Sequence, residues 1–497
     1  MTLHDLTYWE RLASRLEIPT GAYIDGAYMA AADGATFTAR NPATGEALAE
    51  VTACGQQDID RAVAAARRSF ESGSWSRRAP RERKATLLRF AALIERHAEE
   101  LALLQTLEMG KPIADSLSFD LAETARCVAW YAEALDKQYD EIAPTADHVH
   151  ATLTHEALGV VAAVTPWNFP LMISAWKFAP ALAMGNSVVL KPAEQSSLSI
   201  LRLAALAGEA GLPDGVFNVT PGLGAVAGQA LGRHMDVDCL AFTGSTATGK
   251  RFMHYSGDSN LKRVWLECGG KSPHIVFDDC KDLAAAARAA AAGIFTNQGE
   301  VCIAGSRLYV QDAIYDEFLS LLTAAAAQMQ PGNPLDPNSP MGAMVDATQY
   351  RRVQDYIALA QDEGMKLLSG GNTTAPVAGG WYLPPTILEG RHDQTLMRDE
   401  VFGPVLGVTR FTGEEEVIAL ANDSVYGLGA GLWTRDLGRA HRVSKRLRAG
   451  LVWVNCYADG DISVPFGGVK QSGFGRDKSL HALSKYADLK TTWMHLD

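Results

Sequence analysis

Apolar residues recur at helical spacing in the first third of the chain. Ile59, Ala62 and Val63, for example, fall on one face of a single helix. This spacing and its breakers predict helices over residues 5–17, 57–70, 80–109 and 117–136. Short apolar runs separated by turn signals predict a small β section over residues 20–55.

The pattern changes from residue 158, where short apolar strands begin to alternate with helices. Strands are predicted at 159–164, 187–190, 216–219, 239–242 and 263–266. A second series follows Gly269-Gly270, with strands at 274–277, 307–310, 405–408 and 451–454 and helices at 314–328 and 348–363. Such alternation favours parallel strands with right-handed crossovers, so the sequence predicts a doubly wound α/β fold.

Two further stretches, residues 139–157 and 481–497, alternate apolar and polar positions without helical spacing. They carry exposed-type aromatic side chains such as Tyr139 and Trp493. We expect them either to pair as an arm between subunits or to cap a sheet.

Composition narrows the class of protein. The chain has 497 residues, 47% hydrophobic and 21% charged, with a net charge of −12. A chain of this length is expected to form two or three domains, and its acidic balance argues against nucleic-acid or anionic-membrane binding. The seven cysteines form no CxxC pair and have no metal-ligand spacing, which favours thiols in a reducing cytoplasm and no metal site. We find no membrane span, and charges within residues 1–20 argue against a signal peptide.

One cysteine has the setting of a nucleophile. Cys302 lies on a Gly-punctuated turn, 297–306, between an alanine-rich helix at 284–293 and a strand at 307–310. A turn there can present a thiolate at a cleft, provided its surroundings lower the pKa. Read alone, Cys302 could equally be a small core hydrophobe.

Two stretches suggest a nucleotide site. Phe242–Lys250 opens a helix directly after a strand, and Gly244 and Ser245 would offer free N–H groups to a phosphate. The stretch also fits the first part of a P-loop, but Arg251 stands where a Mg²⁺-binding Ser or Thr is needed, so a dinucleotide pyrophosphate is preferred. Lys191 and Glu194 follow another strand and could hold a ribose, or be ordinary solvated charges.

Two polar residues at strand ends are candidates for catalysis. Glu267 leaves an apolar strand at the Gly269-Gly270 hinge, where a carboxylate with a raised pKa could act as general base. Asn168 lies in a loop stiffened by two prolines and could donate to an oxyanion. The alternatives are a surface acid and an Asn that satisfies its own turn.

Together these stretches resemble the NAD(P)-dependent aldehyde dehydrogenase superfamily. The matching motifs run in the family's order: Pro-Trp-Asn at 166–168, Lys-Pro-x-Glu at 191–194, Phe-Thr-Gly-Ser at 242–245, Leu-Glu-x-Gly-Gly-Lys at 266–271, Asn-Gln-Gly-x-x-Cys at 297–302, Glu-x-Phe-Gly-Pro at 400–404 and Pro-Phe-Gly-Gly at 465–468. Within the superfamily the chain is similar to bacterial ω-aminoaldehyde enzymes of polyamine breakdown, through stretches such as 257–260, 433–437 and 470–481.

The resemblance implies a fold in three parts. These are a Rossmann-like cofactor domain over 1–138 and 158–267, an α/β catalytic domain over 268–480, and a small β oligomerisation arm over 139–157 and 481–497. It also implies a homodimer or homotetramer.

The resemblance assigns roles to individual residues. Cys302 becomes the nucleophile, Glu267 the base that activates water, and Asn168 an oxyanion donor together with the backbone N–H of Cys302. The implied NAD-binding residues are Trp167, Lys191, Glu194, Gly244, Ser245, Glu400 and Phe402. A carboxylate such as Glu194 disfavours the 2′-phosphate of NADP, although NADP use stays possible.

The expected reaction oxidises an aldehyde to its carboxylic acid through a thiohemiacetal and a thioester on Cys302. The expected substrate is an ω-aminoaldehyde or γ-glutamyl-γ-aminobutyraldehyde from putrescine breakdown. The implied substrate-binding residues are Phe169, Ile173, Trp176, Val301 and Ile303 in a tunnel, and Asp459, Asp461 and, more weakly, Asp120 for a distal ammonium or amide.

Several alternatives stay open at this point. Loop acids in a turn could explain Asp459 and Asp461 without any substrate contact. Asp477 stands where many family members carry Glu, so its place in a proton relay with Glu267 is open. A broad-specificity aliphatic enzyme, a CoA-acylating enzyme, which Glu267 disfavours, and a non-catalytic protein of the same fold are the competing functions.

Overall fold

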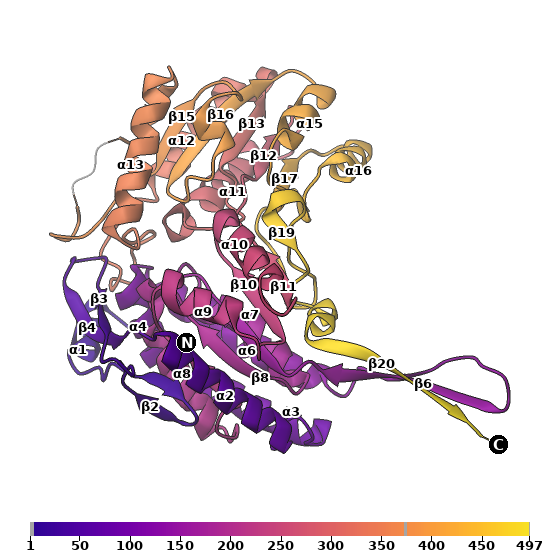
Figure 1. Cartoon of the computed structure of the whole chain (residues 1–497). Helices are drawn as coiled ribbons and strands as arrows, with labels where there is room; N and C mark the ends of the chain where they lie inside the picture. Colours follow the sequence, from indigo (N-terminus) through magenta and orange to yellow (C-terminus); the bar gives the residue numbers. More distant parts are fainter. Residues whose placement is uncertain (1–3, 372–374, 497) are drawn as a thin grey trace.

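The structure, a computed structural model, describes residues 4–371 and 375–496, and two large sheets organise them (Figure 1). The first sheet has the strand order β19-β11-β10-β7-β8-β9-β1-β2. Its strands are β1 Ala22–Ile24, β2 Ala27–Met29, β7 Val160–Val164, β8 Ser187–Lys191, β9 Phe217–Val219, β10 Cys239–Thr243, β11 Arg263–Glu267 and β19 Gly473–Phe474. The five strands from β7 to β11 are mutually parallel, which confirms the predicted doubly wound pattern.

Both faces of this sheet are covered by helices. In β7, Val161 and Ala163 pack into one apolar cluster, whereas Val160 and Ala162 pack into another on the opposite face. Side chains alternate between the faces of a strand, so a strand buried on both faces has a continuous apolar run. The surrounding helices are α1 Leu6–Ala13, α2 Gln56–Ser72, α3 Pro80–Arg96, α4 Ala98–Met109, α6 Leu121–Ala134, α7 Pro170–Ala183, α8 Leu198–Glu209, α9 Gln229–Arg233 and α10 Thr246–Gly257.

Two helix predictions in this region were wrong in detail. The helix predicted over 80–109 is broken at His97, whose backbone φ of −101° and ψ of 20° are not helical. The helix predicted over 117–136 begins with a π-helical turn, Ser116–Asp120, before α6. Apolar spacing continues across both irregularities, so periodicity alone does not reveal them. The predicted end at Gly110 is confirmed, with a left-handed φ of 78°.

The second sheet lies above the first in Figure 1 and has the order β14-β15-β16-β13-β12-β17-β18. Its strands are β12 Pro273–Val276, β13 Arg307–Gln311, β14 Lys366–Ser369, β15 Thr386–Glu389, β16 Val405–Phe411, β17 Gly429–Trp433 and β18 Leu451–Val454. Its helices are α11 Leu283–Phe295, α12 Tyr315–Ala327, α13 Ala347–Asp362, α14 Thr395–Arg398, α15 Glu414–Asn422 and α16 Leu437–Arg446.

The stretches 139–157 and 481–497, predicted either to form an arm or to cap a sheet, do pair with each other. β6 Val149–Ala157 lies between β20 Ala487–His495 and the short β5 Glu141–Ile142, all antiparallel. This small sheet projects from the body of the molecule in Figure 1. A separate hairpin, β3 Thr36–Arg40 with β4 Ala47–Thr52, lies near the N-terminus.

The predicted domain boundaries stay a prediction, and one strand crosses them. β19 lies within the predicted catalytic domain, yet it pairs with β11 at the edge of the first sheet. The chain therefore returns from the second sheet to the first before it enters the arm. Within residues 4–371 and 375–496, every helix is too short or too polar to cross a membrane.

Candidate active site

A cavity of about 170 Å³ lies where loops after the first sheet's strands meet the second sheet. Its walls include the loops that follow β7, β10 and β11, so it opens at the carboxyl edge of parallel strands, the usual ligand position in such folds. The lining contains these residues that the sequence singled out: Trp167, Asn168, Ile173, Gly244, Ser245, Cys302, Glu400 and Phe402. The fold thus brings both catalytic and cofactor candidates to one place.

A strained turn presents Cys302. The preceding Asn297 and Gln298 adopt left-handed φ values of 51° and 56°. A Cβ on Gly299, also left-handed, would lie 2.1 Å from the carbonyl oxygen of Gly403. The Asn-Gln-Gly part of the motif therefore serves the backbone conformation of this turn. Its left-handed residues are strained, and such strain persists only where the surrounding structure holds the backbone in place. Cys302 follows in a tight turn.

The surroundings of Cys302 do not lower the pKa of its thiol. Desolvation raises that pKa to about 12, and the charges of Glu400 and Glu267 add to the shift. The condition attached to the sequence prediction, a lowered pKa, is therefore not met in this state. A cysteine in such a site needs a base to take its proton before it can attack.

Glu267 is a buried carboxyl group at the end of β11. Neither of its oxygens has a hydrogen-bond partner within the described residues. Burial raises its pKa well above the ordinary value, and the charge of Asp477 raises it further. A Cβ on Gly467 would lie 2.6 Å from Glu267 Oε1, so Pro-Phe-Gly-Gly makes room for this carboxyl group.

Asn168 is fixed by hydrogen bonds to the nucleophile's own loop. Its Nδ2 donates to the carbonyl oxygen of Glu300 at 2.9 Å. Asn297 Nδ2 in turn donates to the carbonyl oxygens of Asn168 and Glu300, each at 3.2 Å. An amide nitrogen has two hydrogens, so Asn168 keeps one donor for a ligand in the cavity. Its role at an oxyanion stays a prediction.

Asp477 is surrounded by cations. Lys177 from α7 and Lys485 both form ion pairs with its carboxylate, and all three side chains are buried. Despite burial, the two lysines hold the pKa of Asp477 below its ordinary value. Asp477 is therefore ionised beside Glu267, and its predicted part in a proton relay stays open.

The cofactor candidates occupy the same edge of the sheet. Lys191 Nζ at the end of β8 donates to the carbonyl of Pro192 at 2.9 Å and lies 3.5 Å from Glu194 Oε2. Ser245 caps α10, accepting a hydrogen bond from the N–H of Thr248 at 3.3 Å. Lys250 donates to Gln471 Oε1 at 3.0 Å instead of reaching back over the helix start. This contact argues against the P-loop alternative.

Glu400 and Phe402 also line the cavity. Glu400 Oε1 accepts the N–H of Gly270 at 3.0 Å, and burial raises the pKa of Glu400 to about 7. The rings of Trp167 and Phe402 meet edge to face with centroids 5.3 Å apart. A buried hydroxyl oxygen of Thr243 lines the cavity without a partner within the described residues. This orphaned group, the helix start and the two acids suit the hydroxyls and phosphates of a dinucleotide.

The predicted substrate acids are engaged in other contacts. Asp461 is paired with Arg126 and also accepts the N–H of Ser463 at 2.9 Å. Asp459 accepts the N–H of Gly460 at 2.8 Å. Asp120 is fully buried and paired with Lys111, and its part in substrate binding also stays a prediction. Substrate binding by Asp459 and Asp461 stays a prediction, in which Arg126 competes for Asp461.

The predicted tunnel residues lie close to the cavity. Val301 and Ile303 flank the nucleophile in sequence. The Lys111 ammonium lies 3.8 Å from the ring centroid of Phe169. Trp176, three residues after Ile173 on α7, packs against Phe466 with centroids 5.0 Å apart.

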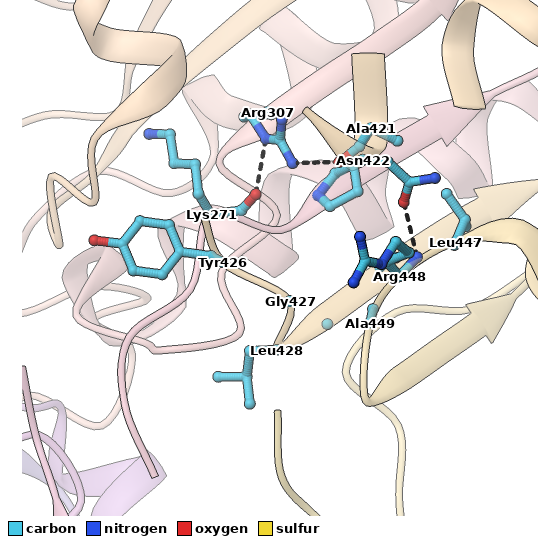
Figure 2. A pocket seen from close by; sticks show the side chains of 13 residues that line it. Lys271, Arg307, Ala421, Asn422, Tyr426, Gly427, Leu428, Leu447, Arg448 and Ala449 are labelled. Carbon is cyan, nitrogen blue, oxygen red and sulfur yellow. Dashed lines mark hydrogen bonds between the residues drawn. The ribbon is translucent and has the colours of Figure 1, made fainter. Parts of the chain in front are cut away.

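A second hollow lies behind the Gly-Gly hinge, and Figure 2 shows it from close by. Arg307 Nε donates to the carbonyl of Lys271 at 2.7 Å, and its Nη2 donates to that of Ala421 at 2.8 Å. The hollow holds only about 10 Å³, less than a substrate needs. Arg307 therefore anchors the segment after the hinge, and the hollow is a packing gap.

A sequence model of the aldehyde dehydrogenase family matches residues 28–492. The chain belongs to the aldehyde dehydrogenase family. This result confirms the resemblance, the fold and the enzyme class predicted from the motifs.

Individual relatives of this aldehyde dehydrogenase extend the comparison. The NADP/NAD-dependent aldehyde dehydrogenase PuuC of Escherichia coli is 55% identical over 497 residues, which is 100% of both chains. The structure of γ-glutamyl-γ-aminobutyraldehyde dehydrogenase from Burkholderia cenocepacia is 54% identical, with a TM-score of 0.98 over 99% of this chain and 100% of that one. The indole-3-acetaldehyde dehydrogenase AldA of P. syringae, solved as a C302A mutant with NAD⁺ and IAA, gives a TM-score of 0.98 at 53% identity over 99% of this chain and 100% of that one.

Sequence reasoning missed several groups of this dehydrogenase's site. Gln349 and Arg352, on the first turns of α13, line the cavity. Gln349 Nε2 donates to the carbonyl of Phe402 at 2.7 Å, and Arg352 donates to that of Glu400 at 2.9 Å. The only sequence signal was a polar pair at i and i+3 on an otherwise ordinary helix. Lys177 had a clearer signal, since it is a charge within the apolar run of α7.

Proposed function

We propose that this chain oxidises an aldehyde to its carboxylic acid with NAD. The observation that carries the proposal is the cavity lined by Cys302, Asn168, Glu400 and Phe402, with Glu267 at the end of β11, the strand whose following loop lines it. Nucleophile, oxyanion donor and base are the three groups that acyl chemistry at an aldehyde carbon requires. Cofactor candidates line the same cavity.

The residues would act in a fixed order. Cys302 Sγ would release its proton to solvent and bond to the aldehyde carbon, forming a thiohemiacetal. The developing oxyanion would accept from Asn168 Nδ2 and from the backbone N–H of Cys302. The chemistry that NAD would supply when bound is that of a hydride acceptor for the thiohemiacetal carbon, which leaves a thioester on Cys302. Glu267 then takes a proton from the water that attacks the thioester, and the acid leaves as Cys302 regains its thiol.

The cofactor would lie along the carboxyl edge of the first sheet. Lys191 and Glu194 would hold the adenosine ribose, and Gly244 with Ser245 at the start of α10 would face the pyrophosphate. Trp167, Glu400 and Phe402 would bound the nicotinamide side. The carboxylate of Glu194 favours NAD over NADP, although the relative PuuC bears a name that includes both.

The substrate we propose is an ω-aminoaldehyde, in particular γ-glutamyl-γ-aminobutyraldehyde. The names of two relatives, at 54% and 49% identity, support this class: the Burkholderia cenocepacia enzyme and an aminoacetaldehyde dehydrogenase of Pseudomonas aeruginosa. The proposed location is the cytoplasm. Exposed Leu489 and Trp493 on β20 would contact a second copy, giving a homodimer or homotetramer.

The test follows NADH by absorbance with three aldehydes, 3-aminopropionaldehyde, γ-glutamyl-γ-aminobutyraldehyde and hexanal. The wild type and Cys302→Ala are compared, each with NAD and with NADP. Loss of NADH in the variant and a preference for the aminoaldehydes support both mechanism and substrate. Equal rates on hexanal remove the aminoaldehyde assignment, and activity in Cys302→Ala removes the mechanism. Added CoA tests the acylating alternative, which requires acyl-CoA as product.

A further inference from the structure

Tyr457 occupies a cradle made by three glycines beside the nucleophile's turn. A Cβ on Gly431 would lie 2.5 Å from its ring, one on Gly293 2.8 Å and one on Gly305 3.1 Å. Contacts below 3.0 Å do not occur for real side chains, so the first two positions must lack one if the ring is to stay. The ring comes from the loop after β18 and enters between α11, the turn after Cys302 and β17.

Two further side chains fix the plane of this ring. His274 stacks on Tyr457 with centroids 4.7 Å apart and an angle of 15° between the rings. Trp433 Nε1 donates to His274 Nε2 at 2.9 Å, which orients the imidazole and places its proton on Nδ1. Burial lowers the pKa of His274 to about 3, so it stays neutral. Trp433 thus lies edge to edge with His274, and His274 stacks on Tyr457.

The hydroxyl group of Tyr457 reaches the nucleophile's turn. It donates to the carbonyl oxygen of Ile303 at 2.7 Å. The N–H of the same peptide group, that of Ala304, donates to the carbonyl of Val301 at 3.0 Å. The peptide between Ile303 and Ala304, one residue beyond Cys302, is thus held from both sides. Desolvation raises the pKa of Tyr457 above its ordinary value, so its hydroxyl stays a donor.

We propose that Tyr457 is a positioning residue that sets the direction of the Cys302 thiol and of the Cys302 N–H. Asn168 fixes the turn from the upstream side, through Glu300, and Tyr457 fixes it from the downstream side, through Ile303. The inference rests on the proposed function for its catalytic consequence. The expected effect on the placement of the turn rests on geometry alone, so the catalytic effect and the effect on the turn are tested separately.

The test compares Tyr457→Phe with Tyr382→Phe. Tyr382 is a matched control because its buried hydroxyl also donates to a backbone carbonyl, that of Ala43 at 3.2 Å, which lies outside the turn that carries Cys302. The first readout is hydrogen–deuterium exchange of the peptide covering 297–306, which requires no catalysis. Loss of one hydrogen bond is expected to speed that exchange by about 5-fold in Tyr457→Phe, and not in Tyr382→Phe.

The second readout is kinetic. The kcat for the aldehyde is expected to fall by about 10-fold or more in Tyr457→Phe, because misplaced reacting groups cost up to about 100-fold. The KM for NAD is expected to stay unchanged, which a disturbance of the cofactor site would not produce. Trp433→Phe, which removes the donor to His274 and part of a buried ring, is expected to act in the same direction with a smaller effect.

Wild-type exchange of 297–306 in Tyr457→Phe overturns the inference, as does the same acceleration in Tyr382→Phe. Faster exchange at an unchanged kcat also overturns it, because the turn would then move without consequence for Cys302. If the wild type shows no NADH production at all, the proposed function fails while the exchange result still tests the placement of the turn.

Discussion

Two buried acids near the cavity, Asp477 and Glu267, have pKa values shifted in opposite directions. Asp477 has two lysines against its carboxylate, and they hold its pKa below the ordinary value. Glu267 has no hydrogen-bond partner within the described residues, and burial raises its pKa well above the ordinary value. Burial therefore favours the neutral form of Glu267, whereas the two lysines favour the ionised form of Asp477. Neighbouring groups whose pKa values are pushed apart are the usual arrangement for acid–base work.

The difference lies in the polar contacts that the fold gives each acid. Asp477 is stabilised as a charge, and its charge in turn raises the pKa of Glu267. Glu267 keeps both oxygens free for a water molecule. A base with a raised pKa is strong enough to take a proton, whereas a paired carboxylate is weak.

The largest expected effect is that of Glu267→Gln. The amide keeps the shape of the side chain but cannot take a proton from water. We expect steady-state turnover to fall by about 1,000-fold, within the range for general bases. Stopped-flow absorbance is expected to show one rapid NADH per site, followed by accumulation of a thioester visible by mass spectrometry of intact protein. A loss of the rapid phase as well would assign Glu267 to the activation of Cys302 instead.

Removing one cation from Asp477 should destabilise the protein. Lys177→Met leaves Asp477 with Lys485 alone, and a broken buried pair costs about 3–5 kcal/mol. Denaturant unfolding measures the loss. Lys84→Met is the control, because Lys84 pairs with Glu133 and Asp136 at the surface and its loss should be much smaller. Equal losses of unfolding free energy in the two variants would mean that burial of the Asp477 ion pairs contributes nothing to their effect on stability.

The pH dependence should separate the two acids. Glu267 works as a base only when deprotonated, so activity should fall as the pH drops through its raised pKa. Asp477→Asn removes a negative charge that raises this pKa, so the acid limb of the kcat profile should move to lower pH. An acid limb that stays at the same pH in Asp477→Asn would mean that the charge of Asp477 does not raise the pKa of Glu267.

The smallest effect concerns stability. A carboxyl group whose pKa is higher in the folded than in the unfolded chain favours folding at low pH. Its contribution falls as the pH rises from the unfolded pKa, 4.5, toward the raised folded pKa. Glu267→Gln should therefore gain stability relative to wild type as the pH increases. Thermal unfolding from pH 5 to 8 measures it, and parallel curves would mean that the folded and unfolded pKa values are equal.

The sequence predicted most of the sheet and the principal candidates. β7 and β8 are continuous apolar runs because they are buried on both faces, and this local signal predicts a central strand. Cys302, Asn168 and Glu267 each follow such a strand or precede one. The family match then confirmed the enzyme class, although the individual roles of these residues stay predictions.

What the sequence could not reveal depends on long-range contacts. The Lys177–Asp477 pair joins residues 300 positions apart, and no local pattern connects them. The cradle of Tyr457 is similar, since Gly293, Gly305 and Gly431 become neighbours only after folding. Asp461 looked like a free loop acid until folding placed Arg126 beside it.

The most direct test of this account follows the infrared difference spectrum between wild type and Glu267→Gln as the pH rises. The account predicts that the carboxyl band found only in the wild type persists above the pH at which an ordinary glutamate ionises, because burial without a partner among the described residues favours the neutral form of Glu267. A band that converts to carboxylate at the pH of an ordinary glutamate would contradict it.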